Sequence, residues 1–168
     1  MRKKIKSFSG GLTSACMVKL DPHDKDTSFL YLDTGAEHPD TYKFIKKVVE
    51  EFNINLVCLR PIVRHGSRKS SDYKVVSVHD IGNDLIPITD VMIKYGKPSF
   101  SAASCTREMK KTLADKWRKD NFPEGSDMWL GIRADEPARY WGDNKKPHLS
   151  TYRMLLRCGL VLDELLDM

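Results

Sequence analysis

The stretch SFSGGLTSACM, at residues 7–17, sets two adjacent glycines between serines, a pattern suited to binding an anion. A Gly-Gly turn lets a ligand approach the backbone closely, and the free N–H groups in the first turn of a helix favour negative charge. Ser9, Thr13 and Ser14 add hydroxyl donors at the same place. The stretch therefore predicts a loop that binds phosphate or pyrophosphate, with an ordinary serine-capped turn as the plain alternative.

The spacing of glycines in the chain excludes two other nucleotide-binding loops. The sequence contains no G-x-x-x-x-G-K-S/T, which is the phosphate loop of P-loop NTPases. It also contains no G-x-G-x-x-G, the fingerprint of dinucleotide-binding domains. A phosphate site at SGG would therefore belong to neither class.

Alternating strand and helix signals surround this loop and must position it. Strand signals lie over residues 4–8, 27–34, 54–61 and 128–133. Helix signals begin at Leu12 and Pro39, and a third helix is expected over 106–119. The order strand, helix, strand, helix, strand predicts an α/β three-layer sandwich, in which helices cover both faces of a mostly parallel, twisted, Rossmann-like sheet.

Each predicted helix has one apolar face. The residues of these faces are Leu12, Cys16 and Leu20, then Tyr42, Ile45, Val49 and Phe52, and finally Met109, Leu113 and Trp117.

The middle of the chain is less regular. There we expect a mobile basic loop at 64–72, a short strand or extended segment at 73–81, and a short helix at 88–96.

Composition favours one cytoplasmic domain. The chain has 168 residues, 40% of them hydrophobic, which is enough for one sizeable core. Its net charge of +5 suits phosphate-bearing ligands without requiring a nucleic acid. The four cysteines lie far apart with no C-x-x-C pair, which argues against zinc and against a disulfide scaffold and fits a reducing compartment. No apolar run reaches membrane-spanning length.

Short motifs in a fixed order resemble those of a known family. They are SGGLTS at 9–14, YLDTGAEHPDTYKFI at 31–45, CTREMKK at 105–111 and GIRADEPARY at 131–140. Together they resemble the phosphoadenosine phosphosulfate (PAPS) reductase branch of the PP-loop, or N-type, ATP pyrophosphatases within the adenine nucleotide alpha hydrolase-like superfamily. The similarity is greatest to short members that bacteriophages often carry. It implies a nucleotide-binding domain over 1–145, followed by a divergent helical segment of the same domain over 146–168.

The resemblance also implies roles for single residues. Ser9, Gly10, Gly11, Leu12, Thr13 and Ser14 would surround a phosphate of ATP or PAPS, and Asp33 would lie near the nucleotide or ligate Mg²⁺. Arg107, Lys110, Lys111, Arg133 and Arg139 would reach the ligand anion, with Glu37 and Glu136 as partners of the arginines. Ser9, Asp33, Lys110 and Arg133 would take part in catalysis. Taken singly, each basic residue is more typical of a solvated surface charge, and only together with the loop do they predict a cationic pocket.

Departures from the family pattern leave the reaction open. PAPS reductases use a cysteine in a Glu-Cys-Gly-Leu-His segment, whereas RCGLV at 157–161 lacks the flanking Glu and His, so we interpret Cys158 as a residue of a packed helix. Cys105 stands without the further cysteines that an iron–sulfur cluster needs. The candidate functions are PP-loop chemistry at an α-phosphate, thiol-dependent PAPS reduction, and nucleotide binding without catalysis. The acceptor, a protein partner, a homo-oligomer, and a divergent or truncated C-terminus all stay open.

Overall fold

The computed structural model describes residues 2–20, 27–63, 72–83, 92–93, 106–133 and 149–156. Its elements are β1 (Lys3–Ser7), α1 (Leu12–Leu20), β2 (Thr27–Leu32), α2 (Pro39–Phe52), β3 (Leu56–Ile62), β4 (Asp72–Val76), the 3₁₀ turn η1 (Val78–Asp80), the π-helical turn η2 (Arg107–Lys111), α5 (Thr112–Asn121), β5 (Ser126–Arg133) and β6 (Leu149–Leu156). The predicted alternation of strands and helices is confirmed from β1 to β3 and again at α5 and β5.

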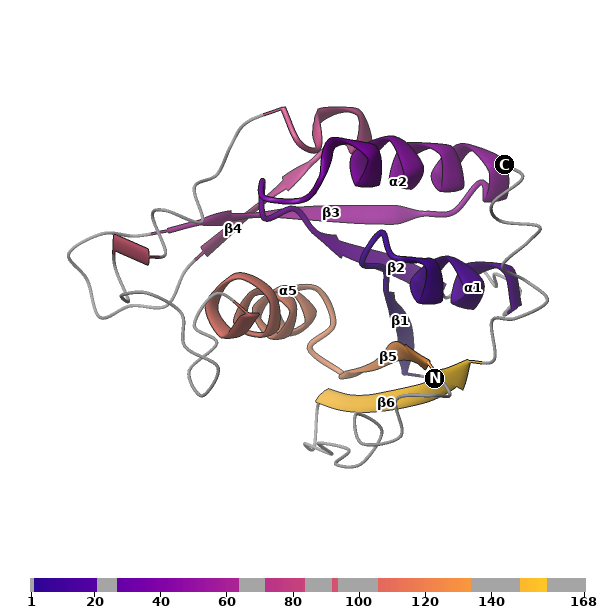
Figure 1. Ribbon diagram of the computed structural model, residues 1–168. Coiled ribbons are helices and arrows are strands. Elements are labelled where there is room, and N and C mark those ends of the chain that lie inside the picture. Colours follow the sequence, from indigo (N-terminus) through magenta and orange to yellow (C-terminus); the bar gives the residue numbers. More distant parts are fainter. Residues whose placement is uncertain are drawn as a thin grey trace.

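The described strands form one six-stranded sheet in the order β4-β3-β2-β1-β5-β6 (Figure 1). All neighbouring strands run parallel except β4, which pairs antiparallel with β3 at one edge. Ser7, the last residue of β1, aligns with Leu30 in β2 and Leu130 in β5. The carboxyl ends of these central strands therefore point to the same edge of the sheet, where open α/β folds bind ligands.

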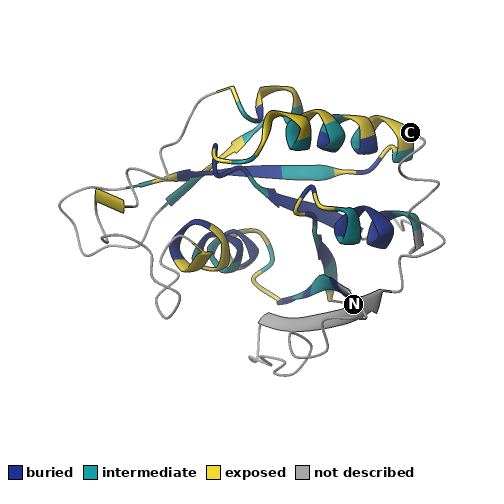
Figure 2. Cartoon of the chain, in the orientation of Figure 1, coloured by how far each residue is buried: buried dark blue, intermediate teal, exposed yellow. Residues whose placement is uncertain are grey.

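Helices cover both faces of this sheet, as predicted. The core on one face joins α1 and α2 to the sheet through residues such as Phe8, Phe29 and Ile45. The core on the other face joins α5 to the sheet and contains Leu30 and Trp117. Figure 2 shows the central strands buried between these layers, while the outer side of α2 is exposed. The α/β three-layer sandwich is thus confirmed.

Helix α2 begins and ends at residues with clear local signals. Its N-cap is His38, whose side chain accepts a hydrogen bond from the backbone N–H of Asp40, and Pro39 occupies the first helical position. Asn53 ends the helix in the left-handed conformation, with φ of 46° and ψ of 44°. The capped start of α2 fixes the segment that leads into it from β2.

Two segments that were predicted to be α-helical have a different secondary structure. Residues 106–119 were expected as one α-helix, but Arg107–Lys111 form a π-helical turn that continues into α5. The π turn spaces hydrogen bonds more widely, and such turns are frequent at functional sites. The helix predicted within 146–168 is wrong for Leu149–Leu156, which pair along β5 as strand β6. A short apolar run suits either structure, and pairing with a distant strand decides between them.

Other predictions are settled in part. Asp72–Val76 is a strand, as one of the two interpretations of the middle region held. Met92 and Ile93 are helical, but the remainder of the expected 88–96 helix lies outside the described residues, as do 64–71 and Cys158. None of the described helices has the length and apolar character needed to cross a membrane.

Candidate nucleotide site

The serine-glycine loop closes on itself through short-range hydrogen bonds. The Ser9 backbone N–H donates to Oγ of Ser14 over 3.2 Å, and Ser14 Oγ donates to the carbonyl oxygen of Gly11 over 2.6 Å. That carbonyl also accepts from the backbone N–H groups of Ser14 and Ala15 as α1 begins. The loop therefore joins the end of β1 to the first turn of α1 in a defined conformation.

The two glycines of this loop differ in their surroundings. Gly10 has a φ of +73°, and a β-carbon there would lie 2.8 Å from Cγ2 of Thr41 and 2.8 Å from Cδ1 of Ile45. Gly11 is exposed, and within the described ranges a β-carbon there would meet only Oγ of Ser9, at 3.5 Å. Gly10 is thus needed for packing against α2, whereas Gly11 leaves its backbone open to a ligand.

Asp33, which directly follows β2, is fully buried and paired with Arg60 of β3. Its Oδ2 accepts from Nε and Nη2 of Arg60, at 3.0 and 2.8 Å, and from the backbone N–H of Gly82 at 3.3 Å. Its Oδ1 accepts from the backbone N–H of Gly35 at 3.2 Å. The exposed fractions of the Arg60 and Asp33 side chains are 2% and 0%. The carboxylate is therefore neutralised inside the protein, at the sheet edge where the resemblance placed it.

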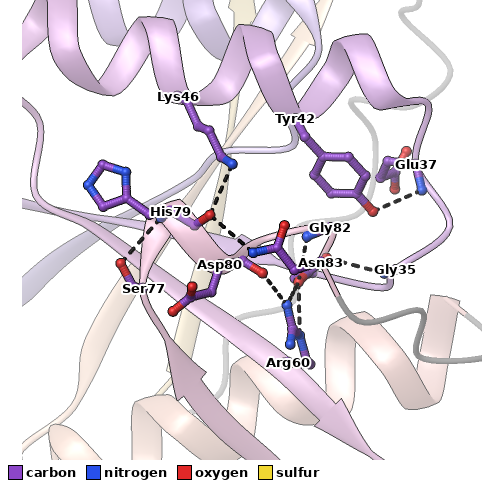
Figure 3. A network of polar contacts seen from close by, with 11 residues as sticks. Gly35, Glu37, Tyr42, Lys46, Arg60, Ser77, His79, Asp80, Gly82 and Asn83 are labelled. Carbon is purple, nitrogen blue, oxygen red and sulfur yellow. Dashed lines mark hydrogen bonds and ion pairs between the residues drawn. The ribbon is translucent and has the colours of Figure 1, made fainter.

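The segment from Ser77 to Asn83 rests on this ion pair and on α2 (Figure 3). Nη2 of Arg60 donates to the carbonyl oxygen of Asp80 over 2.6 Å. Nζ of Lys46 in α2 donates to the carbonyl oxygen of His79 over 3.0 Å. Gly82, with φ of +76°, packs so closely on Tyr42 that a β-carbon would lie 2.8 Å from Cδ2 of the ring. The segment is thereby fixed beside the turn that carries Asp33.

The π-helical turn η2 places the cation Lys110 beside the turn that carries Asp33. Nζ of Lys110 lies 3.5 Å from Oε1 of Glu37, and both side chains are partly exposed. The backbone N–H of Glu37 donates to the Tyr42 hydroxyl over 3.2 Å, which orients the residue. Arg107 pairs instead with its neighbour Glu108, at 2.8 Å. Glu37 was expected to partner an arginine, and the structure gives it a lysine.

The remaining predicted cations are described only in part. Arg133 ends β5, at the same edge as the carboxyl ends of β1 and β2. Its side chain lies outside the described part of the chain, as do Arg139 and Glu136. Lys111 is exposed on the π-helical turn. The structure thus gathers the loop, the Asp33 turn, Lys110 and the end of β5 on one edge.

Comparison with known families agrees with this geometry. The phosphoadenosine phosphosulfate reductase domain family matches residues 3–141, which is most of the chain. The chain belongs to this family. Its PP-loop-type fold and the order of motifs from the serine-glycine loop to the end of β5 are those of a family member.

This family member is similar to two uncharacterized proteins. It is 37% identical over 143 residues to the nin region protein ORF290 of Escherichia phage lambda, a match that covers 80% of this chain and 49% of that protein. It is 38% identical over 55 residues to protein MJ0973 of Methanocaldococcus jannaschii, covering 32% of this chain and 13% of that protein. The chain thus spans about half the length of its phage relative.

A solved structure shares the fold of this family member. It is the crystal structure of phosphoadenylyl-sulfate reductase from Candida auris in a phosphate complex. The TM-score is 0.59 at 13% sequence identity, and the match covers 99% of this chain and 72% of that chain. At this identity the likeness supports the fold alone.

The described part of this family member contains no preformed metal site. No three His, Cys, Asp or Glu side chains of the described residues lie together in a way that could hold a metal. Asp33, the expected Mg²⁺ ligand, already accepts hydrogen bonds on both carboxylate oxygens. A buried carboxylate that is neutralised by arginine has little charge left for a cation. Asp33 is thus suited to holding the turn rather than to ligating Mg²⁺.

Sequence reasoning missed Arg60 and Tyr31 in this family member. Arg60 stands in the apolar run INLVCLRP, which is expected to be buried. Because a buried arginine requires a charged or hydrogen-bonding partner, its place in that run could have indicated an ion pair. Tyr31 lies in β2 with 2% exposure, and its hydroxyl has no hydrogen-bond partner in the described part of the chain. Burial, together with the nearby Tyr42 and Asp33, raises the pKa of Tyr31 well above its ordinary value. No sequence pattern would have signalled that hydroxyl.

Proposed function

We propose that this chain binds an adenine nucleotide, ATP or PAPS, with a phosphate group in the Ser9–Ser14 loop. The observation that carries the proposal is the exposed backbone at Gly11, where, among the described residues, a β-carbon would meet only Ser9 Oγ, at 3.5 Å. Its N–H donates to Ser9 Oγ over 3.4 Å, a long hydrogen bond that a phosphate oxygen can replace at small cost. Membership of the phosphoadenosine phosphosulfate reductase domain family supports the same ligand class.

The cations of the sheet edge would complete the site. Lys110 is held beside the Asp33 turn by Glu37, and Arg133 leaves the end of β5 at the same edge. Positive charges fixed before the ligand arrives stabilise the charge of a polyphosphate and of its transition state. Arg107, Lys111 and Arg139 are proposed to add to this field when the nucleotide is bound.

We infer PP-loop chemistry at the α-phosphate as the reaction. An acceptor oxygen would form a bond to the α-phosphorus while the bond from that phosphorus to the β-phosphate oxygen breaks, and pyrophosphate leaves. The loop would hold the departing phosphates, with Ser9 donating a hydrogen bond, while Lys110 and Arg133 neutralise the charge that develops. Asp33 is given a positioning role in place of the catalytic role that the resemblance implied.

The described cysteines do not support a thiol-dependent reduction. Cys16 and Cys58 are both buried in the core between the sheet and helices α1 and α2. Burial, with a smaller effect from nearby Asp33, raises the pKa of Cys58 to about 12. Since a thiolate is the nucleophile in such reactions, Cys58 cannot serve as one at neutral pH.

Calorimetric titration with ATP and with PAPS, followed by product analysis, tests the proposal. We expect binding by the unchanged chain, loss of binding in folded Gly11→Val, and release of pyrophosphate from ATP when an acceptor is supplied. Binding without products would leave a nucleotide-binding protein that lacks catalysis. Thioredoxin-dependent release of sulfite from PAPS would establish the reductase alternative. Absence of binding to both nucleotides, or equal affinity in Gly11→Val, would overturn the proposed site.

A further inference from the structure

Arg60 of β3 is a buried cation beside the candidate site, where it donates several hydrogen bonds. It donates twice to Oδ2 of Asp33 and once to the carbonyl oxygen of Asp80, over 3.0, 2.8 and 2.6 Å. Charge-assisted hydrogen bonds of this kind are stronger than neutral ones, and the planar guanidinium fixes their directions. Arg60 therefore joins β3, the turn after β2 and the Ser77–Asn83 segment at one point.

We propose that Arg60 is a positioning residue of the nucleotide site, an inference that rests on the function proposed above. Through Asp33 it sets the conformation of the turn from Asp33 to Glu37, and through Asp80 it holds the Ser77–Asn83 segment against that turn. Arg60 itself, with 2% of its side chain exposed, does not contact the ligand. Its effect on binding is exerted through the groups that it holds.

The connection from Arg60 to the cationic edge runs through described contacts. Asp33 accepts from the backbone N–H groups of Gly35 and Gly82, one on each side of the ion pair. Gly82 packs on the Tyr42 ring, and the Tyr42 hydroxyl accepts from the backbone N–H of Glu37. Glu37 in turn pairs with Lys110. A shift of the Asp33 turn would therefore move the cation that is proposed to meet the phosphate.

Stability alone is a weak reason for such an ion pair. Burying two charges costs free energy that their attraction only partly returns, so apolar residues of similar size often stabilise a protein as well. The pair differs from an apolar contact in its direction, because it aligns two backbone N–H groups and one carbonyl at defined distances. Geometry at the sheet edge is thus what Arg60 and Asp33 contribute.

The variant Arg60→Lys provides the first test. A lysine keeps the positive charge beside Asp33 but has a single nitrogen, so it cannot reproduce the forked contact to Asp33 together with the bond to Asp80. Arg60→Lys should remain folded and should bind ATP and PAPS about tenfold or more weakly, as expected when a hydrogen-bonded arrangement of this size is lost. Because Arg60→Met alone would leave a buried unpaired carboxylate and can fail to fold, the double variant Arg60→Met with Asp33→Asn is the second test.

Arg118 in α5 offers a matched control. It is as buried as Arg60, with 1% exposure, and its Nε and Nη2 donate to Ser126, the first residue of β5. Since the amino end of β5 is at the edge opposite the candidate site, Arg118→Lys should lower the melting temperature and leave nucleotide affinity unchanged.

Hydrogen exchange gives a readout that does not depend on ligand. We expect the amides of Gly35 and Gly82 to exchange faster in both Arg60 variants and to keep their rates in Arg118→Lys. Weaker binding together with faster exchange in the Arg60 variants supports the inference. Unchanged affinity and exchange in folded Arg60→Lys overturn it while the proposed function stands, whereas failure of the unchanged chain to bind either nucleotide removes the proposed function and this inference together.

Discussion

Gly10 packs so tightly on Ile45 that a β-carbon at position 10 would lie 2.8 Å from Cδ1 of that side chain. The φ of +73° at Gly10 is also unfavourable for residues that have a β-carbon. We therefore expect Gly10→Ala to lower the free energy of unfolding by about 1–3 kcal/mol, measured by urea denaturation.

Gly11→Ala is the control for this prediction, since a β-carbon at position 11 would lie at an ordinary contact distance, 3.5 Å, from Oγ of Ser9. It should change the free energy of unfolding by less than about 0.5 kcal/mol. If both variants lose the same stability, the contact between the loop and α2 does not hold the loop in place.

Much of this fold was predictable from local patterns in the sequence. The strands ending near Ser7 and Leu32, and the helix beginning at Pro39, follow from apolar spacing, a proline at the first helical position and flanking turn residues. Strand β6 was not predictable in this way, because Leu149–Leu156 become a strand by pairing with β5. The π-helical turn was also missed, since apolar spacing alone does not distinguish it from an α-helix.

The candidate site was predictable as a set of motifs and much less as a set of contacts. The serine-glycine loop and the position of Asp33 at the sheet edge came from the sequence. The partner of Asp33 did not, because the ion pair with Arg60 depends on the register of β2 against β3. Similarly, the pairing of Lys110 with Glu37 depends on how the π-helical turn approaches the β2–α2 segment.

Replacing Glu37 should strengthen anion binding. Its carboxylate lies 3.5 Å from Nζ of Lys110 and competes with a ligand phosphate for that cation. Glu37→Gln should therefore raise the affinity for ATP a few-fold, in line with the about 0.2–1 kcal/mol of an exposed ion pair. The gain should shrink as salt concentration rises, because screening weakens the pair.

Calorimetry at two salt concentrations would measure this effect, with Glu50→Gln on the exposed side of α2 as the control for the change in net charge. Weaker binding in Glu37→Gln would mean that the positioning of Lys110 by Glu37 outweighs the competition between this carboxylate and the ligand phosphate.

The Tyr31 hydroxyl should lower the free energy of unfolding of the protein. It is buried and has no hydrogen-bond partner among the described residues, so removing it should relieve an uncompensated loss of hydration. We expect Tyr31→Phe to raise the free energy of unfolding by up to about 1–2 kcal/mol. Tyr42→Phe is the matched control, because the Tyr42 hydroxyl accepts from the Glu37 backbone N–H and its loss should lower stability by about 0.5–1.5 kcal/mol. Equal losses in the two variants would show that the Tyr31 hydroxyl is bonded in solution.

Alkaline pH should destabilise the protein through Cys58. Burial raises the pKa of this thiol from its ordinary value of 9.0 to about 12. Below pH 9 the thiol is protonated in both folded and unfolded chains, so it gives no pH dependence. Between about pH 9 and pH 12 the unfolded chain releases the proton while the folded chain keeps it, so the free energy of unfolding falls as pH rises. Tyr31 and Tyr42, whose pKa values are also raised by burial, act in the same direction.

Cys58→Ala isolates the thiol's share of that slope. It should reduce the fall of the free energy of unfolding with pH by up to about 1.4 kcal/mol per pH unit, which is the slope for the release of one proton. This holds whatever the substitution does to stability at neutral pH. Denaturant unfolding at several pH values from 8 to 11 would measure both slopes. The same burial predicts that alkylating agents modify Cys58 slowly in the folded chain and rapidly in urea. An unchanged slope in Cys58→Ala, or fast alkylation of the folded chain at pH 8, would show that the thiol is exposed to solvent and that the core around β3 opens readily.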